Sequence, residues 1–150
     1  MSAISGIEGF GTKWYLDESM VKEYYRRADE GDMECQYELA RVLVPGEDFG
    51  AFKRDATSAV HYYELAANQG CIDAAFNLAN LYEKGGFKFE PDIHKAFYWR
   101  KKCTDLGDKE ACRLVSKMYL EGRGTERDVV MAVWYKEQGE RENIEYRRSK

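Results

Sequence analysis

Hydrophobic residues recur at helical spacing through most of this chain, and the clearest run lies between Gly70 and Gly107. In the first half of that run, apolar residues stand three and four positions apart: Ala74, Leu78, Leu81 and Tyr82. This spacing places them on one face of an α-helix, with polar residues between them on the other face. The pattern therefore predicts an amphipathic helix.

A second amphipathic helix follows after a short loop. Gly85 and Gly86 end the first helix, since glycine readily adopts the left-handed conformation of a helix end. Asp92 is placed to cap the second helix, whose apolar stripe is marked by Ala96, Trp99 and Cys103. Two amphipathic helices joined by a short loop are expected to pack as antiparallel neighbours.

The same arrangement occurs three times at intervals of 36 to 39 residues. The positions that repeat are the linker glycines (Gly31, Gly70, Gly107), the cap aspartates (Asp55, Asp92, Asp128) and the second-helix alanines (Ala59, Ala96, Ala132). Periods of this length indicate stacked helical repeats. Seven helices are expected, near residues 17–30, 33–44, 56–69, 72–84, 92–106, 109–121 and 128–142. The predicted core is Ala74, Leu78, Tyr82, Ala96, Trp99, Ala111, Val115, Tyr119 and Ala132.

The pattern G-x-x-x-A-x-x-x-L-x-x-x-Y-x-x-G, followed by D-x-x-x-A-x-x-W/Y, resembles the Sel1-like repeat, a relative of the tetratricopeptide repeat. The resemblance covers roughly residues 20 to 143. It implies an all-α, right-handed solenoid of antiparallel helix pairs that serves as an adaptor for protein complexes. The first unit departs from the pattern, because Cys35 replaces the small alanine and the loop at 45–54 is longer.

One repeat domain is expected over residues 1–150. It would consist of a loose N-terminus (1–16), a capping helix (17–30), repeats near 31–69, 70–106 and 107–143, and a charged tail (144–150). Gly139 is expected to be a small packing residue inside the last helix, and Asn143 stands at the turn position. The tail would either cap the stack or fray.

Charge and composition exclude several classes of function. The net charge is −4 and the isoelectric point is near 5.3, which argues against a nucleic-acid partner because such proteins present a basic face. No apolar run has the length of a membrane span. The first residues lack the basic head and apolar block of a secretory signal, so a cytoplasmic chain is expected.

Candidate chemistry is sparse. His61 and His94 have no second ligand at metal-binding spacing, so neither a metal nor a cofactor is expected. In some secreted members of the resembled family a cysteine pair bridges neighbouring helices, and Cys103 and Cys112 resemble that pair with Cys103 shifted by one position. A disulfide between them and a pair of reduced, buried thiols both stay open.

The surface predicted to bind a partner comes from the resemblance, because the first helix of each pair lines the concave side of tetratricopeptide-like stacks. Its residues fall three, six and ten positions after each linker glycine, on one helical face. Read across the repeats, this gives an acidic row (Glu34, Asp73, Glu110), a central row (Tyr37, Phe76, Arg113) and a polar-basic row (Arg41, Asn80, Lys117). Tyr, Phe and Arg are enriched where interfaces carry energy.

The sequence therefore predicts a non-enzymatic module that binds another protein through its concave face. One alternative is a cytoplasmic immunity protein or antitoxin, whose acidic charge would suit a basic toxin domain. A second alternative is a penicillin-recognising hydrolase, since Ser19 and Lys22 match the Ser-x-x-Lys spacing of those enzymes. No companion motif accompanies that pair, so both residues are better interpreted as surface positions of a capping helix.

Overall fold

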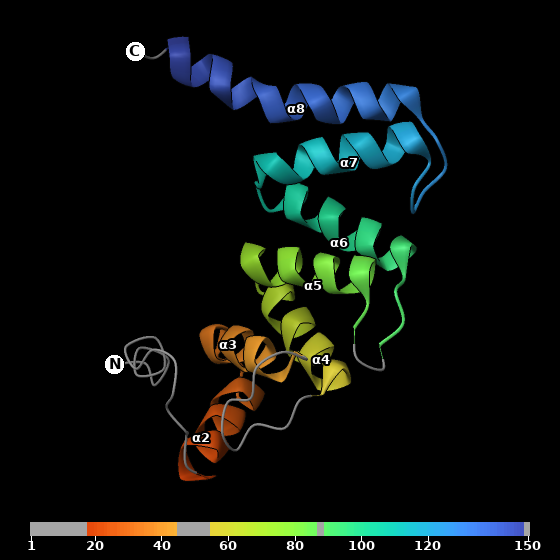
Figure 1. Ribbon diagram of the computed structural model, residues 1–150. Helices are drawn as coiled ribbons and strands as arrows, with labels where there is room; N and C mark the ends of the chain where they lie inside the picture. Colours follow the sequence, from red (N-terminus) through yellow and green to blue (C-terminus); the bar gives the residue numbers. More distant parts are fainter. Residues whose placement is uncertain (1–17, 45–54, 87–88, 149–150) are drawn as a thin grey trace. The chain divides into compact units, whose positions relative to one another are not determined.

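A computed structural model describes residues 18–44, 55–86 and 89–148, with side chains placed up to residue 141 (Figure 1). These ranges contain seven α-helices and no strand, as the sequence predicts for an all-α repeat fold. The expected loose N-terminus (1–16) and the long loop at 45–54 lie outside the described residues.

The helices follow the predicted order with short connections. Their bounds are α2 (Glu18–Asp29), α3 (Met33–Leu43), α4 (Ala56–Asn68), α5 (Ile72–Lys84), α6 (Ile93–Asp105), α7 (Lys109–Glu121) and α8 (Val129–Arg148). Every predicted start, and every predicted end but the last, agrees with the structure to within one residue. That is the precision expected of any helix boundary.

The end of the last helix is a correction. The sequence predicts a turn at Asn143, whereas α8 continues without interruption to Arg148. The residues after Asn143 include no glycine or proline, and helices normally end where one of these interrupts them. Gly139 lies inside the helix, as predicted. A Cβ atom added there would lie 3.2 Å from the Cβ of Cys112 and 3.3 Å from the carbonyl oxygen of Lys109, so the glycine allows α8 to approach α7 closely.

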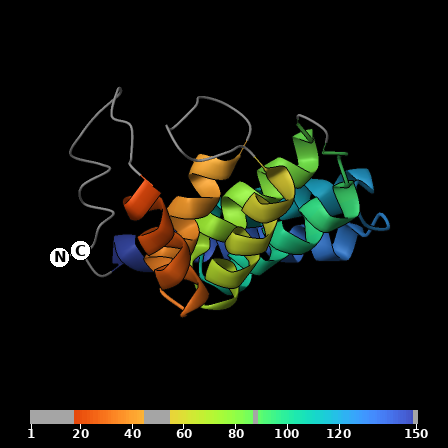
Figure 2. The same cartoon turned by 90° about the horizontal axis from the view of Figure 1, so that it is seen from below.

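The chain forms two compact units. The first comprises Met1–Ala74 with Gly86–Phe89, and the second comprises Ala75–Gly85 with Glu90–Lys150. In the first unit α3 packs between α2 and α4 (Figure 2). In the second unit α7 packs between α6 and α8. Each unit thus buries the apolar faces of successive antiparallel helices against one another.

In each repeat, the aspartate before the second helix makes the same two kinds of hydrogen bond. The side chain of the aspartate before the second helix accepts a hydrogen bond from a backbone amide in the first turn, as Asp92 Oδ1 does from Lys95 at 3.1 Å. The backbone amide of the same aspartate donates to the carbonyl of the residue twelve after the linker glycine. These three bonds are Asp55 to Leu43 (2.9 Å), Asp92 to Tyr82 (2.7 Å) and Asp128 to Tyr119 (3.0 Å).

The linker glycines end each second helix in one conformation, and Gly107 is representative. Its φ is +102°, a value that L side chains rarely adopt. The amide of Gly107 donates to Thr104 and the amide of Asp108 donates to Cys103, both at 3.0 Å. This is the Schellman arrangement, which satisfies the last carbonyl groups of a helix. Gly31 and Gly70 have φ values of +106° and +103° and the same bonding pattern.

The core confirms the predicted register. All nine residues expected in it are buried: Ala74, Leu78, Tyr82, Ala96, Trp99, Ala111, Val115, Tyr119 and Ala132. In the second unit, Tyr119 stacks on Tyr135 with ring centroids 5.7 Å apart, while Phe97 meets Tyr119 edge-on at 5.1 Å. Consecutive helices are therefore joined by apolar contacts at repeated positions.

Enlarging a core alanine tests this register. Ala96 is fully buried on α6, so Ala96→Leu is expected to overpack the helix contact and to lower the free energy of unfolding by about 1–3 kcal/mol. The matched control is Tyr98→Leu, because Tyr98 is 58% exposed on the same helix. Urea titrations followed by circular dichroism measure both. Equal stability of the two variants would contradict the register.

Candidate functional site

The candidate site in the first unit centres on Tyr37 in α3. Its half-buried ring lies 6.2 Å from the ring of Tyr63 in α4, and the guanidinium of Arg41 lies 5.6 Å from the ring centroid. Arg41 also pairs with the carboxylate of Glu38 at 3.0 Å. Tyr37 is thus supported from within by one aromatic ring and flanked by a cation, a geometry in which cation–π attraction favours a defined ring position. Glu34 is exposed one turn earlier.

The candidate site in the second unit is built around a buried arginine. Arg100 of α6 is only 5% exposed, and its Cζ lies 5.9 Å from the ring centroid of Phe76 in α5. Its Nη2 donates to Asn80 Oδ1 at 2.9 Å and to the carboxylate of Glu83. The other carboxylate oxygen of Glu83 pairs with Arg123 at 3.2 Å. Nη1 of Arg100 is buried with no acceptor among the described residues.

The charge balance at this cluster perturbs Glu83. Burial by itself raises the pKa of the Glu83 carboxyl, but the hydrogen bond and charge of Arg100, with the charge of Arg123, outweigh burial and lower the pKa below its ordinary value. Glu83 is therefore ionised at neutral pH and is the counter-ion for two guanidinium groups. The cluster fixes Phe76 and Asn80, both half-buried, at the surface of α5.

Equivalent positions in the three repeats hold different residue types and make different contacts. Tyr37 contacts Tyr63, and Phe76 contacts Arg100. In both pairs the first member is six after the linker glycine and the second is eight after the cap aspartate. In the third repeat these positions hold Arg113 and Lys136, which are exposed. The pair at these two positions thus changes from two aromatic rings to an aromatic ring with a cation and then to two cations.

The remaining predicted residues are at the surface. Glu34, Asp73 and Glu110 are exposed, and each lies in the first turn of its helix. Lys117 is also exposed, with its Nζ 3.9 Å from a carboxylate oxygen of Glu121. The structure brings Tyr37 together with Arg41, and Phe76 together with Asn80 through Arg100. Tyr37 belongs to the first unit, whereas Phe76 and Arg113 belong to the second.

Arg100 is the residue of the candidate site in the second unit that the sequence did not predict. It lies in the charged run Trp99-Arg100-Lys101-Lys102, where a cation is ordinarily solvated. The one sequence signal for its burial is its position in the repeat. Arg100 stands eight residues after the cap aspartate, as does Tyr63, which contacts Tyr37. Only the neighbouring helix shows that Arg100 is the one buried cation of this run.

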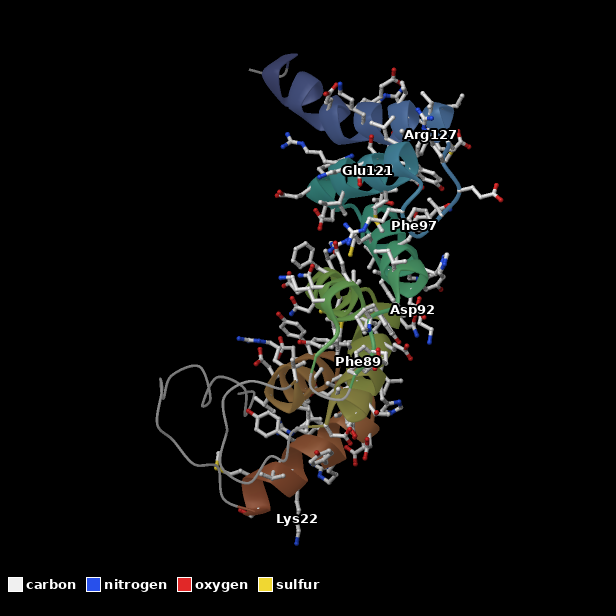
Figure 3. The ribbon with its side chains drawn as sticks, turned by 45° about the vertical axis from the view of Figure 1, so that its right-hand side comes forward. Lys22, Phe89, Asp92, Phe97, Glu121 and Arg127 are labelled. Atoms are coloured by element: carbon white, nitrogen blue, oxygen red, sulfur yellow. The ribbon has the colours of Figure 1, made fainter. Side chains whose placement is uncertain are left out.

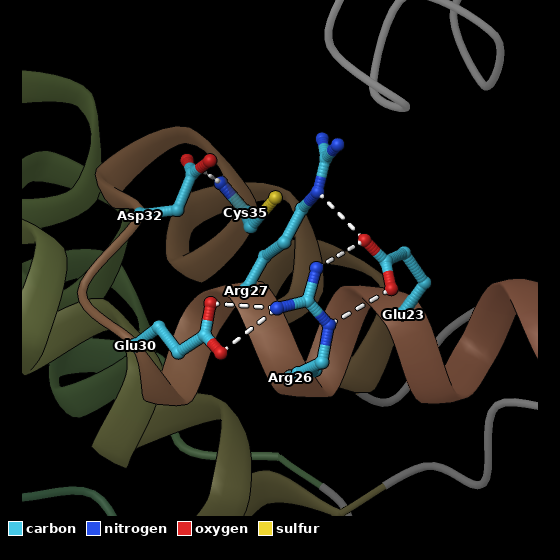
Figure 4. Close-up of polar contacts among 6 residues, drawn as sticks. All are labelled: Glu23, Arg26, Arg27, Glu30, Asp32 and Cys35. Carbon is cyan, nitrogen blue, oxygen red and sulfur yellow. Dashed lines mark hydrogen bonds and ion pairs between the residues drawn. The ribbon is translucent and has the colours of Figure 1, made fainter.

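Helix α2 carries an ion-pair network on its surface (Figure 4). Arg26 pairs with Glu23 at 2.7 Å and with Glu30 at 2.8 Å, and Arg27 pairs with Glu23 at 3.0 Å. The hydrogen bond from Arg26 lowers the pKa of Glu23 to about 2. Ser19 and Lys22 are both exposed on the same helix. The side chain of Lys22 points away from the helix (Figure 3). Both residues thus occupy the surface positions that the structural interpretation assigned to them.

The cysteines are present as thiols. Cys35, Cys103 and Cys112 are buried, and Cys71 is half-buried. Burial, with the nearby carboxylate of Asp32, raises the pKa of Cys35 to about 11, so it stays protonated at neutral pH. Within the described ranges, no three His, Cys, Asp or Glu side chains gather as metal ligands. None of the described helices is both long and apolar enough to cross a bilayer.

The chain is similar to curated fungal and vertebrate proteins. It is 30% identical over 131 residues to the chitin synthase regulator SKT5 of Saccharomyces cerevisiae, covering 85% of this chain and 18% of that protein. It is 34% identical to chitin synthase regulatory factor 1 of Schizosaccharomyces pombe, covering 74% and 24%. Cytochrome c oxidase assembly factor 7A of Xenopus laevis is 33% identical, covering 48% and 31%. The chain thus spans less than a third of each of these relatives.

Solved structures agree with the fold. One is a protective antigen of uropathogenic Escherichia coli with an SLR fold, at a TM-score of 0.65 and 25% identity, covering 82% of this chain and 26% of that one. A Sel1 repeat protein from Oxalobacter formigenes has a TM-score of 0.64 and 24% identity, covering 81% and 89%. The sequence model of the Sel1 repeat matches residues 34–71, 72–108 and 109–138. Proteins built from this repeat generally mediate protein–protein interaction, and the chain belongs to the Sel1 repeat family.

Proposed function

We propose that this chain binds a partner protein through the first helices of its repeats, with Tyr37, Phe76 and Arg113 at the centre of the contact. The observation that carries the proposal is the construction of the central row. Tyr37 and Phe76 are each half-exposed and each rest on a residue of the second helix, Tyr63 or Arg100. Aromatic side chains held in one position lose little rotamer freedom on binding, which favours affinity.

The names of the relatives support a regulatory or assembly role. A chitin synthase regulator and a cytochrome c oxidase assembly factor both act on other proteins, as their names state. We infer that this chain acts in the same general way, as an adaptor that holds a protein partner and carries out no chemistry on it. Repeats of this kind present extended surfaces because each repeat adds a small contact beside the previous one.

A second candidate function is neutralisation of a basic toxin, as an immunity protein or antitoxin would do. The observation that favours it is the acidic row, since Glu34, Asp73 and Glu110 are all exposed. A carboxylate in the first turn also stabilises its own helix, so the row has a structural explanation as well. The identity of the captured partner distinguishes the two functions.

Truncation of the central row tests the proposal. Affinity capture from the source cell identifies the partner, and calorimetry then measures its affinity. Phe76→Ala is expected to weaken binding by about 2 kcal/mol, roughly 30-fold, as for an interface hot spot. The combined Tyr37→Ala, Phe76→Ala and Arg113→Ala variant should abolish measurable binding.

The matched control is Tyr98→Ala, which removes an aromatic ring that is 58% exposed on the second helix of the same repeat. It should leave affinity unchanged. A thermal melt of each variant checks folding, because Phe76 also covers Arg100. The proposal is wrong if the folded triple variant binds as tightly as the unmodified chain, or if Tyr98→Ala alone abolishes binding.

A further inference from the structure

The first turns of α8 expose apolar side chains. Val129, Val130 and Val133 are 49%, 77% and 50% exposed. The side of an amphipathic helix that faces water is expected to be polar, and apolar residues are expected on the side that packs. Three exposed valines on one helix are therefore unexpected, and the equivalent positions of the preceding repeat can be compared with them.

The preceding repeat shows what covers these positions. Val129 and Val133 stand one and five residues after Asp128, as Ile93 and Phe97 stand after Asp92. On α6, the ring of Phe97 packs edge-on against Tyr119 of α7 at 5.1 Å. The loop after α7 also lies over this part of α6, because a Cβ atom on Gly124 would be 2.5 Å from the carbonyl oxygen of Ile93. The following helix and its loop thus cover on α6 the positions that α8 leaves exposed.

Trp134 belongs to a different row. It stands six after the cap aspartate, as Tyr98 and His61 do, and all three side chains are exposed. Tyr98 is 58% exposed although α7 packs beside its helix. This row therefore faces solvent in every repeat, and Trp134 is not part of the surface that a following helix would cover.

Two acidic residues continue the uncovered stripe along α8. Glu137 and Glu140 stand four and seven residues after Val133, on the same helical face, and both are exposed. The equivalent residues of α6 are Lys101 and Thr104. The α8 end face, which we define as Val129, Val130, Val133, Glu137 and Glu140, is therefore apolar in its first half and acidic in its second.

This surface does not complement itself. In an antiparallel pair of α8 helices the valines of one copy would meet the carboxylates of the other, and in a parallel pair the carboxylates would face each other. Burying an unpaired carboxylate, or opposing two of them, is unfavourable. A second copy of this chain is therefore a poor occupant.

We propose that the α8 end face binds one amphipathic helix of a partner protein, basic in its first half and apolar in its second, in the place that α7 takes on α6. The short linker makes α7 antiparallel to α6 (Figure 1). An antiparallel helix would bring its N-terminal cations to Glu137 and Glu140 and its C-terminal apolar residues to the valines. Amphipathic helices bind other proteins in this way, by placing their apolar side chains on an apolar surface. It uses a surface separate from the central row of the proposed function.

A synthetic helix tests this proposal. The probe has the sequence of residues 108–122 with Ala111→Lys and Val115→Lys, so that Tyr119 can meet Val133 while the lysines meet Glu137 and Glu140. A covalent staple joins positions 113 and 117, which are exposed on α7, and holds the peptide helical. A matched peptide has Ala111→Glu and Val115→Glu instead. Fluorescence anisotropy of the labelled peptides measures binding to the complete chain.

The lysine peptide is expected to bind at least about 10-fold more tightly than the glutamate peptide, and Glu137→Lys with Glu140→Lys should reverse that preference. Val129→Asp with Val133→Asp should remove binding of both peptides, while Tyr98→Asp should change neither. All the substituted side chains are exposed, and circular dichroism verifies the fold. Equal binding of the two peptides, no binding of the lysine peptide, or a dimer in sedimentation that Val133→Asp dissociates would overturn the proposal.

Discussion

Gly124→Ala is expected to lower the free energy of unfolding by about 3 kcal/mol, from strain at a positive φ and from overpacking. Gly124 has a φ of +76°, in the left-handed region. An added Cβ atom would also lie 2.5 Å from the carbonyl oxygen of Ile93 and 2.9 Å from the Cβ of Phe97. One of these atoms belongs to the backbone of α6 and the other is the first side-chain atom of Phe97, so neither can move aside easily.

The local contacts explain why this loop matters. The Nδ1 atom of His94 lies 3.1 Å from the carbonyl oxygen of Gly124, so the loop between α7 and α8 is fixed to the start of α6. Phe97 lies on α6, and Arg127 lies near the end of this loop (Figure 3). A displaced loop would disturb the packing of Phe97 on Tyr119 as well.

Gly122→Ala is the matched control. Gly122 has a similar φ of +66°, but an added Cβ atom would lie no nearer than 3.3 Å to another atom, the Cβ of Arg127. This variant should therefore lose only the backbone contribution, about 1 kcal/mol. Urea denaturation of the two variants measures the difference. Equal losses would show that the close approach of Gly124 to α6 contributes nothing to stability.

Glu83→Ala should also destabilise the chain by about 3 kcal/mol, because it leaves the buried guanidinium of Arg100 without its carboxylate partner. Arg100 is 5% exposed, so water cannot easily replace Glu83. Arg123→Ala removes the other cation that pairs with Glu83, but its side chain is 51% exposed. That variant should cost less than about 1 kcal/mol.

Lowering the pH should reproduce the loss of stability expected for Glu83→Ala, because it protonates the Glu83 carboxylate. The pKa of Glu83 is lower in the folded chain than its ordinary value of 4.5, so the unfolded chain binds more protons as the pH falls. The stabilisation from ionised Glu83 is complete above pH 4.5 and is lost progressively below it. The difference in unfolding free energy between the unmodified chain and Glu83→Gln should therefore shrink from pH 7 to pH 3. A constant difference over that range would contradict the assignment of Glu83 as the partner of Arg100.

The positions of the helices could be predicted from the sequence because the signals for them are local. A cap aspartate, a linker glycine and an apolar residue every three or four positions act within one or two turns, and three copies of the pattern average out its irregularities. The predicted buried face follows from the same periodicity, and all nine predicted core residues are buried. The end of α8 was misjudged because Asn143 only permits a helix to end and does not require it.

The sequence by itself determined the repeat and the positions of the seven helices in the described ranges, and it led to the proposed rows of residues on their outer faces. It could not show that Arg100 is buried beneath Phe76, or that Val129 and Val133 stay exposed while Ile93 and Phe97 do not. Periodicity states which face of a helix is apolar, but a side chain is buried only when another helix covers it. Whether a cation is solvated or paired, and whether an apolar stripe is core or surface, depends on neighbours distant in sequence. Tertiary structure alone decided those two points.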